Sequence, residues 1–246
     1  MKIFLPMAGR GSRFADQGIM TPKPLVEVSG RPMIAFALEG LCKIDCSEII
    51  FVALKRHYYK YHLDDLMQLY PYHQFKFVLL EKTTDGQLCS ILAAREHIKH
   101  GEDILIGASD TYVVSNIGKD IARRRIDCEG IISVAEMPGD NWSFARIGKD
   151  GGVTEVAEKR RISHLASTGL YYFSNGRRFL ELADEMIRNR EKTRGEYYVI
   201  PIFQKYIDRG WRIDISMARE VWDMGTPQAK EDFERHLASG AHRKMD

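Results

Sequence analysis

The segment that decides the fold reads Ile3-Phe4-Leu5-Pro6-Met7-Ala8-Gly9-Arg10-Gly11-Ser12-Arg13-Phe14. Its first residues, Ile3 to Met7, form a short apolar run that is typical of a buried strand. The glycines that follow let the backbone approach a ligand closely, and successive N–H groups of such a loop can surround phosphate oxygens. The segment therefore predicts a strand that leads directly into an anion-binding loop.

This segment differs from two well-known phosphate-binding loops. A Walker A loop requires the pattern GxxxxGK[ST], which the chain does not contain. A dinucleotide-binding loop requires GxGxxG or GxGxxA, and here Phe14 occupies the third position, where it is too bulky for close helix–strand contact. Binding of NAD or FAD in that mode is therefore disfavoured, while a simple tight turn remains an alternative for Gly9-x-Gly11.

Strands and helices alternate along the first half of the chain. Apolar runs predict strands at 48–54, 75–80 and 103–108, and amphipathic patterns predict helices at 33–41, 57–70 and 87–99. A repeated strand–loop–helix order is typical of a parallel sheet with helices on both faces.

The second half carries shorter strands separated by turn signals. We predict strands at 130–137, 145–147, 153–158, 170–173 and 213–217, and helices at 177–190, 197–209 and 226–237. Thr226 is a suitable N-cap for the last helix, with Pro227 at its first position. The prediction is one α/β domain over residues 1–246, with a Rossmann-like nucleotide-binding half at 1–115 and a mixed-sheet, acceptor-binding half at 116–246.

Composition limits the partners of the protein. The 246 residues include 36 Lys and Arg against 34 Asp and Glu, so no overall field attracts nucleic acid or an anionic membrane, and an anionic ligand needs a local site. The four cysteines match no metal or disulfide spacing, and no apolar segment resembles a signal peptide or a membrane span. We expect a soluble, cytoplasmic protein, and the sequence is compatible with a homo-oligomer.

A lysine between two prolines lies shortly after the glycine loop, in Thr21-Pro22-Lys23-Pro24-Leu25. Proline restricts its own backbone and that of the preceding residue, so Lys23 is held on a stiff segment. A cation fixed beside an anion-binding loop suits phosphoryl chemistry, although a surface lysine is the alternative. Gly30-Arg31-Pro32-Met33 then completes a spaced set of three motifs.

The combination GxGxR, PKPL and Gly-x-Pro-Met resembles the signature of the sugar-1-phosphate nucleotidylyltransferases, also called nucleotide-diphosphosugar pyrophosphorylases, of the bacterial capsule and surface-glycan type. The resemblance extends from Lys2 to about Phe233. It implies a three-layer α/β/α fold of GT-A-like form with a mixed, mostly parallel central sheet. It also implies transfer of a nucleotidyl group from an NTP to a phosphorylated acceptor, with Mg²⁺ as cofactor and pyrophosphate as the second product.

The resemblance assigns roles to residues on the nucleotide side. Arg13 and Lys23 become the catalytic cations around the triphosphate. The expected nucleotide-binding residues are Pro6, Met7, Ala8, Gly9, Gly11, Ser12, Gly86, Gln87 and Ser109. Among these, Gly86 and Gln87 begin a helix at the place where relatives recognise the base. Pro6 lacks an N–H, so one backbone donor to the base is missing here.

Two aspartates are the expected metal ligands. Asp110 follows the strand at 103–108, so it should lie at the carboxyl edge of the sheet, where α/β folds bind their ligands. Asp223, in Trp222-Asp223-Met224-Gly225-Thr226, lies between the last strand and the last helix. Mg²⁺ prefers one or two carboxylates with water and phosphate oxygens, and the resemblance gives both residues this role. A helix cap or turn is the alternative for each.

The acceptor side carries weaker signals. Glu158 and Lys159 end a predicted strand, and the resemblance gives them contacts with acceptor hydroxyls and with the acceptor phosphate. The alternative is a solvated charged turn, because two arginines follow. Gly169, in a Thr-Gly-x-Tyr strand, and Glu196 complete the expected acceptor site. Ala145 replaces a glycine that is frequent in the family, which removes one expected close contact with the sugar.

Three other functions remain open. The same core would serve a cytidylyltransferase for a non-sugar phosphate or phosphonate acceptor. A glycosyltransferase of similar fold would need a metal-binding Asp-x-Asp motif, which Asp110-Thr111-Tyr112 does not supply. A non-enzymatic nucleotide sensor is the third alternative, and the complete set of candidate catalytic residues argues against it.

Overall fold

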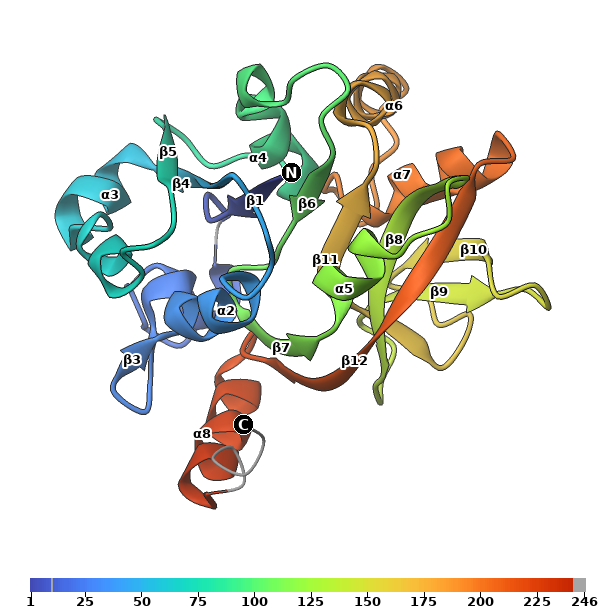
Figure 1. Cartoon of the computed structure of the whole chain (residues 1–246). Coiled ribbons are helices and arrows are strands. Elements are labelled where there is room, and N and C mark those ends of the chain that lie inside the picture. Colours follow the sequence, from blue (N-terminus) through green and yellow to red (C-terminus); the bar gives the residue numbers. More distant parts are fainter. Residues whose placement is uncertain (10, 241–246) are drawn as a thin grey trace.

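A ten-stranded mixed sheet forms the centre of the protein (Figure 1). The computed structural model describes residues 1–9 and 11–240, without the side chains of Ser12, Leu66 and Leu69. The strands are β1 Lys2–Pro6, β4 Glu48–Leu54, β5 Phe75–Leu80, β6 Ile104–Ile106, β7 Thr111–Ser115, β8 Cys128–Glu136, β9 Ser143–Ile147, β10 Val153–Glu158, β11 Leu165–Phe173 and β12 Arg212–Asp223. A separate hairpin pairs β2 Glu27–Val28 with β3 Arg31–Pro32.

The strand order is β5-β4-β1-β6-β11-β8-β12-β7, and β9 connects β10 to β11. In the first half of the chain, β5, β4, β1 and β6 all run parallel. Both faces of β1, β4 and β6 are buried: Phe4 and Ile50 pack on one face, and Ile3 and Ile49 on the other. Burial on both faces explains the continuous apolar runs of these strands.

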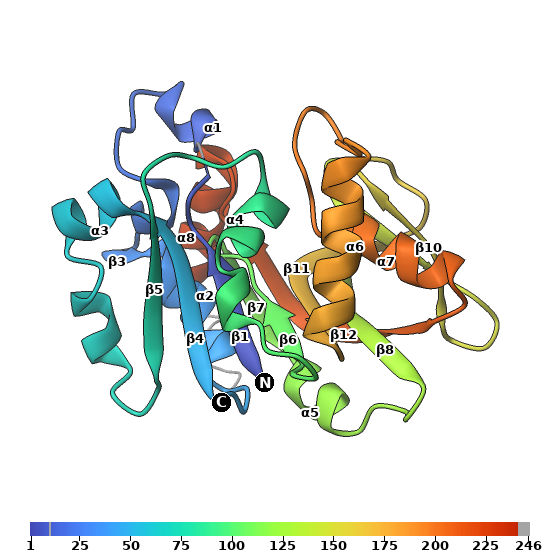
Figure 2. The ribbon, with the colours of Figure 1, turned by 90° about the horizontal axis from the view of Figure 1, so that it is seen from above.

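Helices cover both faces of the sheet. Those longer than one turn are α2 Met33–Leu41, α3 Lys55–Tyr61, α4 Gln87–Ala93, α5 Ile117–Ala122, α6 Gly176–Arg188, α7 Ile200–Asp208 and α8 Pro227–Ala238; short turns are α1 Ser12–Ala15, η1 Lys23–Leu25, η2 Asp65–Leu69 and η3 Arg95–His97. The helices α4, α6 and α7 pack on one face, which is the near side in Figure 2, and α2, α3 and α5 pack on the other. The predicted three-layer α/β/α fold is confirmed.

Some predicted elements have other bounds. The helix predicted at 57–70 divides into α3 and η2, because His62 ends α3 in the left-handed conformation. The helix predicted at 87–99 ends at Ala93, and a short η3 follows it. The strand predicted at 213–217 is only the first part of β12, where it pairs with β8; the second part of β12 pairs with β7. The sequence analysis missed β7 and α5.

The last helix is anchored to the sheet by aromatic packing. Phe233 of α8 stacks on Tyr112 at 5.5 Å and meets the edge of Phe36 at 5.2 Å between ring centroids. As predicted, Thr226 caps this helix, since its Oγ1 accepts a hydrogen bond of 3.1 Å from the N–H of Ala229. Both contacts hold the segment that contains Asp223.

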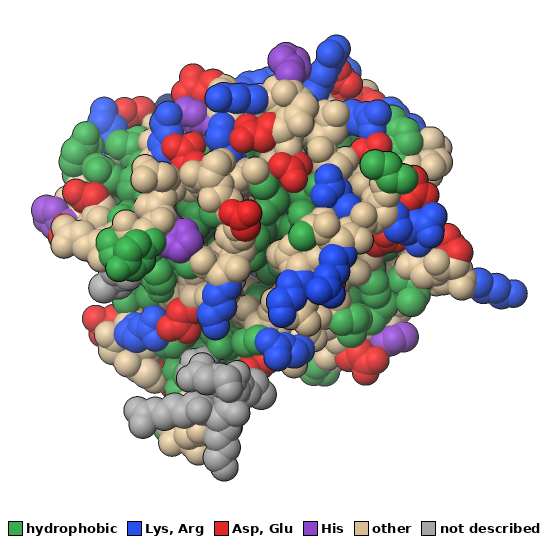
Figure 3. Space-filling view, viewed as in Figure 1, with side chains coloured by type: hydrophobic (Ala, Val, Ile, Leu, Met, Phe, Trp, Pro, Cys, Tyr) green, Lys and Arg blue, Asp and Glu red, His purple; other side chains and the backbone are tan. Residues whose placement is uncertain are grey.

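Charges of both signs are interspersed on the face shown in Figure 3. This distribution agrees with the formal net charge of +2. Within the described residues, no helix is long and apolar enough to cross a membrane.

Candidate functional site

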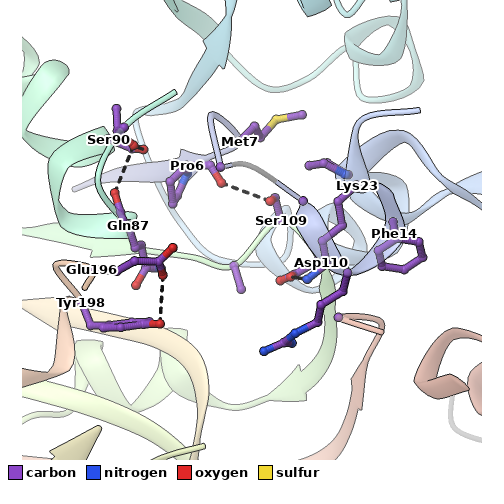
Figure 4. A pocket seen from close by; sticks show the side chains of 18 residues that line it. Pro6, Met7, Phe14, Lys23, Gln87, Ser90, Ser109, Asp110, Glu196 and Tyr198 are labelled. Carbon is purple, nitrogen blue, oxygen red and sulfur yellow. Dashed lines mark hydrogen bonds and ion pairs between the residues drawn. The ribbon is translucent and has the colours of Figure 1, made fainter. Parts of the chain in front are cut away.

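A cavity of about 350 Å³, called the larger cavity below because a neighbouring one is smaller, lies at the carboxyl ends of β1 and β6 (Figure 4). Residues predicted as functional that line it are Pro6, Met7, Gly9, Gly11, Arg13, Lys23, Gly86, Gln87, Ser109, Asp110 and Glu196. The remaining lining residues are Phe14, Pro24, Thr84, Ser90, Ala108, Tyr198 and Gly225. The fold thus brings together segments that are up to about two hundred residues apart in the sequence.

The glycine loop and the lysine segment lie against each other. Gly11 has a left-handed backbone (φ +62°), and a Cβ built there would lie 3.5 Å from Cβ of Lys23. Ser109 Oγ donates a 3.1 Å hydrogen bond to the carbonyl oxygen of Pro6 and so joins the ends of β6 and β1. The loop that follows β1 is therefore held at the cavity by contacts from two other segments.

Lys23 forms an ion pair with Asp110 inside the larger cavity. The two side chains are 20% and 26% exposed. Burial raises the pKa of Asp110, but the neighbouring ammonium group and hydrogen bonds outweigh it, so the pKa lies below its usual range. The cation predicted to serve a triphosphate thus neutralises a predicted metal ligand.

The second carboxylate, Asp223, lies close to the first. Asp223 is opposite Thr111 in the antiparallel pair β7·β12, and the N–H of Met224 donates to the carbonyl oxygen of Asp110 at 2.9 Å. Burial and then the negative charge of Asp110 raise the pKa of Asp223 to about 6. A Cβ on Gly225 would lie 2.7 Å from Asp223 Oδ1 and 3.1 Å from Lys23 Nζ, so a larger residue here would displace the ends of these two side chains.

The two aspartates fit a divalent cation that is bound together with phosphate. Within the described residues, no group of three or more His, Cys, Asp and Glu side chains could hold a metal by itself. Mg²⁺ is usually held by one or two carboxylates and takes its other ligands from substrate phosphates and water. The negative charge of Asp110 already acts on Asp223, so a cation between them would relieve their repulsion.

At the other end of the cavity, the loop before α4 is joined to the segment 196–198. The N–H of Tyr197 donates to the carbonyl oxygen of Asp85 at 2.8 Å, and the N–H of Leu88 donates to the carbonyl oxygen of Tyr197 at 3.0 Å. Gly86 has φ +111°, and a Cβ there would lie 2.6 Å from the Tyr197 oxygen. Only glycine allows this close contact between two backbone segments. The same contact makes the helix predicted at 197–209 begin only at Ile200.

Glu196 lies in the larger cavity, whereas the sequence analysis assigned it to the acceptor. The hydroxyl of Tyr198 donates a 2.9 Å hydrogen bond to Glu196 Oε2 (Figure 4). Burial and the neighbouring Glu196 raise the pKa of Tyr198 above its usual range. The sequence analysis gave Tyr198 no role.

A second cavity, of about 140 Å³, shares Gln87 and Tyr198 with the first. Three of the four predicted acceptor residues line it, namely Glu158, Lys159 and Gly169. The others are Thr111, Met137, Asn141, Trp142, Ser143, Ser167, Thr168, Tyr171 and Val221. The two cavities therefore adjoin along a common wall.

Glu158 is a buried carboxylate with fixed partners. Its side chain is 2% exposed, Ser143 donates a hydrogen bond to Oε2, and Lys159 Nζ lies 3.5 Å from Oε1. Burial raises the pKa of Glu158, although Ser143 and the positive charge of Lys159 oppose the rise. Lys159 has a left-handed backbone (φ +55°) and donates to the carbonyl oxygen of Asn141 at 2.5 Å.

Three predicted residues are placed differently from the rest. Ala8 is fully buried and does not line the cavity. The side chain of Ser12 lies outside the described residues, and Asp223 borders the larger cavity through Gly225. Gly169 lines the second cavity, and a Cβ on it would also lie 2.9 Å from the Cβ of Ala108. Thr84, Ser90 and Ser143 were missed, because isolated hydroxyl residues carry no pattern in the sequence. Thr168 is the threonine of the Thr-Gly-x-Tyr strand, but the sequence analysis gave a role only to the glycine.

Comparisons with known proteins agree with this geometry. The chain is 26% identical over 249 residues to "UTP--glucose-1-phosphate uridylyltransferase AglF" of Haloferax volcanii, with 96% of each chain covered. It is 27% identical over 207 residues to "Bifunctional protein GlmU" of Thermotoga maritima, which covers 81% of this chain and 43% of GlmU. The solved nucleoside-diphosphate-sugar pyrophosphorylase from Vibrio cholerae RC9 is 27% identical, with a TM-score of 0.80 over 95% of this chain and 99% of that one.

A family model described as "Nucleotidyl transferase" matches residues 5–240, which is nearly the whole chain. This match includes the glycine loop, Lys23 and both aspartates of the larger cavity. The protein belongs to the nucleotidyl transferase family.

Proposed function

We propose that the protein transfers a nucleotidyl group from an NTP to a sugar 1-phosphate, releasing pyrophosphate and forming a nucleotide-activated sugar. The observation that carries this proposal is the pair of adjoining cavities. One is lined by the glycine loop, Lys23 and Asp110, with Asp223 at its border, and the other is lined by Glu158 and Lys159. The names of the relatives, a glucose-1-phosphate uridylyltransferase and a pyrophosphorylase, support the same assignment.

The reaction needs positioning and charge neutralisation rather than a base. An oxygen of the acceptor phosphate attacks the α-phosphorus in line, a new P–O bond forms, and the bond from the α-phosphorus to the bridging oxygen breaks. The leaving pyrophosphate takes the electron pair of that bond. Because the acceptor phosphate is already ionised near neutral pH, no side chain has to remove a proton.

The cations of the two cavities and the two aspartates each have a place in this scheme. The backbone N–H groups of Gly9 and Gly11 with Arg13 would hold the β- and γ-phosphates, and Lys23 would neutralise charge at the α-phosphate. Lys159 would hold the acceptor phosphate from the adjoining cavity. Asp110 and Asp223 would hold Mg²⁺, which neutralises the triphosphate when bound.

Recognition of the base and of the sugar belongs to the remaining residues. Gly86 and Gln87 begin α4 beside the larger cavity and would contact the base, with Ser109 near the loop after β1. Glu158 and Gly169 would contact the sugar. We place the reaction in the cytoplasm, where NTPs are formed, and its product in surface-glycan synthesis.

A screen of four NTPs against phosphorylated acceptors tests the proposal. We expect Mg²⁺-dependent release of pyrophosphate with at least one NTP, and only when a sugar 1-phosphate is present. Hexose 1-phosphates are the main acceptors to test, and phosphocholine and a phosphonate are the comparison acceptors. Transfer from a nucleotide sugar without pyrophosphate chemistry, or no pyrophosphate with any pair, would overturn it.

A further inference from the structure

We propose that two hydroxyl residues of the second cavity determine acceptor recognition: Ser143 positions the carboxylate of Glu158, and Thr168 binds a hydroxyl group of the acceptor. The inference rests on the proposed function, since it concerns how the same acceptor cavity selects its substrate. It adds two residues to which the sequence analysis gave no role and whose roles follow from their surroundings in the fold.

Ser143 fixes one end of the Glu158 carboxylate. The two residues lie directly opposite each other in the antiparallel pair β9·β10, and Ser143 Oγ donates a hydrogen bond to Glu158 Oε2. The hydroxyl of the buried Tyr171 in turn donates to Ser143 Oγ at 3.5 Å. With Oε2 held in this way, Oε1 is the oxygen of Glu158 that can accept a further hydrogen bond.

Thr168 places an unsatisfied hydroxyl in the same cavity. Thr168 is 3% exposed, and its Oγ1 has no hydrogen-bond partner among the described residues. Thr168 lies in the stretch of β11 where the register with β8 shifts between Ser167 and Tyr171. Buried polar groups are nearly always paired, so an orphaned hydroxyl that lines a cavity indicates a ligand partner.

The charges around Glu158 favour a neutral partner for it. Lys159 Nζ lies 3.5 Å from Glu158 Oε1, and the positive charge of Arg194 also acts on this carboxylate. An acceptor with an ammonium group would meet two cations that already neutralise Glu158. A neutral body with neighbouring hydroxyl groups can instead donate to Glu158 and pair with Thr168. A quaternary ammonium group can form neither hydrogen bond, so Thr168 would stay unsatisfied.

Thr168→Val tests the second role, because valine keeps the shape and removes the hydroxyl. We expect the KM for the sugar 1-phosphate to rise about 3- to 10-fold, as for one lost neutral hydrogen bond, with the KM for the NTP unchanged. The melting temperature should stay the same or rise, since an unsatisfied buried group is removed. Thr168→Ser should restore the acceptor KM, and Thr154→Val, at an exposed site of β10, is the matched control.

Two results would contradict the role of Thr168 in binding the acceptor. An unchanged acceptor KM in Thr168→Val would overturn the assignment. A lower melting temperature with an unchanged KM would show that the hydroxyl serves the fold and binds no substrate.

Ser143→Ala tests the positioning role through the pH dependence of acceptor use. The groups that act on Glu158 from the surrounding elements are Ser143, Lys159, Tyr171, Arg194 and Tyr198. Loss of the Ser143 donor removes a contact that favours the charged carboxylate. The acid limb of kcat/KM for the acceptor should therefore move to higher pH, while the KM for the NTP stays constant. Ser47→Ala, at an exposed serine, serves as control.

The results separate this inference from the proposed function. If the wild-type protein releases pyrophosphate with no pair of NTP and phosphorylated acceptor, both fail. If the wild type is active and Ser143→Ala keeps the wild-type pH profile and acceptor KM, only the positioning role fails. If the wild type uses phosphocholine in preference to every sugar 1-phosphate, the hydroxyl recognition fails, while nucleotidyl transfer stands.

Discussion

At the scale of single residues, the larger cavity is organised by one cation between two carboxylates. Lys23 is paired with Asp110, and its Nζ lies next to Gly225, which also contacts Asp223. The stem of Lys23 packs beside Gly11 of the anion-binding loop. One side chain therefore lies between the loop for the phosphates and the two candidate metal ligands, and its removal should affect both.

Replacing Lys23 by methionine keeps the stem and removes the charge. We expect kcat to fall on the order of 10²-fold or more, because a preorganised cation at the reacting phosphate is lost. Pyrophosphate release measures this loss, and circular dichroism establishes that the variant is folded. Lys76→Met, at an exposed lysine of β5, is the control and should keep wild-type turnover. A folded Lys23→Met protein with wild-type turnover would contradict the role of Lys23.

The buried Glu158 makes stability depend on pH in a defined direction. Its pKa is raised in the folded protein, so the folded state binds the proton more tightly than the unfolded chain does. The stabilisation from this proton is fully present below the usual pKa of glutamate and is lost as the pH rises through the raised value. The free energy of unfolding of the wild type should therefore fall more steeply over this range than that of Glu158→Gln. Urea unfolding at a series of pH values compares the two, and parallel curves would contradict the prediction.

At the scale of elements, local sequence patterns predicted the helices and strands in which the element's own residues decide which side is buried. The bounds of α2, β4, β5 and β10 are confirmed, because each contains an apolar pattern that fits one geometry. In contrast, β7 and the second part of β12 depend on each other, although about a hundred residues separate them. Local motifs also predicted most of the residues that line the larger cavity. Tyr198 lies in this cavity because of a backbone contact between distant segments, which no local pattern encodes.

The contact between the loop before α4 and the segment 196–198 gives a prediction for Gly86. Its backbone angles, φ 111° and ψ 176°, lie in a region that only glycine adopts readily, and a Cβ would meet the backbone of Tyr197. We expect Gly86→Ala to lower the free energy of unfolding by about 1–3 kcal/mol. It should also raise the KM for the NTP, since Gln87 and Glu196 would move apart. Chemical unfolding and initial rates measure the two effects.

Gly101→Ala is the matched control for Gly86→Ala. Gly101 also has a positive φ (+75°), but no atom lies within 4 Å of a Cβ built there. This variant should lose stability through backbone strain alone and keep the wild-type KM. Equal KM values for both variants would show that the backbone contact at Gly86 does not shape the nucleotide cavity.

At the scale of the whole molecule, each cavity is built from both halves of the chain. The larger one combines the loop after β1 with Gly225 after β12, and the smaller one combines Gln87 of α4 with residues of β9, β10 and β11. Gln87 and Tyr198 line both cavities, so a nucleotide in one and an acceptor in the other would lie next to each other along this wall. A nucleotide bound with its metal should therefore join the two halves and stabilise the entire fold.

If the nucleotide stabilises the fold in this way, the melting temperature should rise in the presence of NTP, and the rise should depend on the metal. A ligand at about 100 times its Kd stabilises the folded state by about 2.7 kcal/mol, so the cognate NTP with Mg²⁺ should raise the melting temperature by several degrees. Addition of EDTA should remove most of this shift, because the triphosphate would then repel Asp110 and Asp223. In Asp223→Asn, Mg²⁺ should add little to the shift in melting temperature caused by the NTP. The Asp223→Asn protein without nucleotide should be no less stable than the wild type, because the substitution replaces a buried carboxylate that has a raised pKa by a neutral side chain. A shift that persists in EDTA, or an unchanged response to Mg²⁺ in Asp223→Asn, would contradict metal binding by the two aspartates.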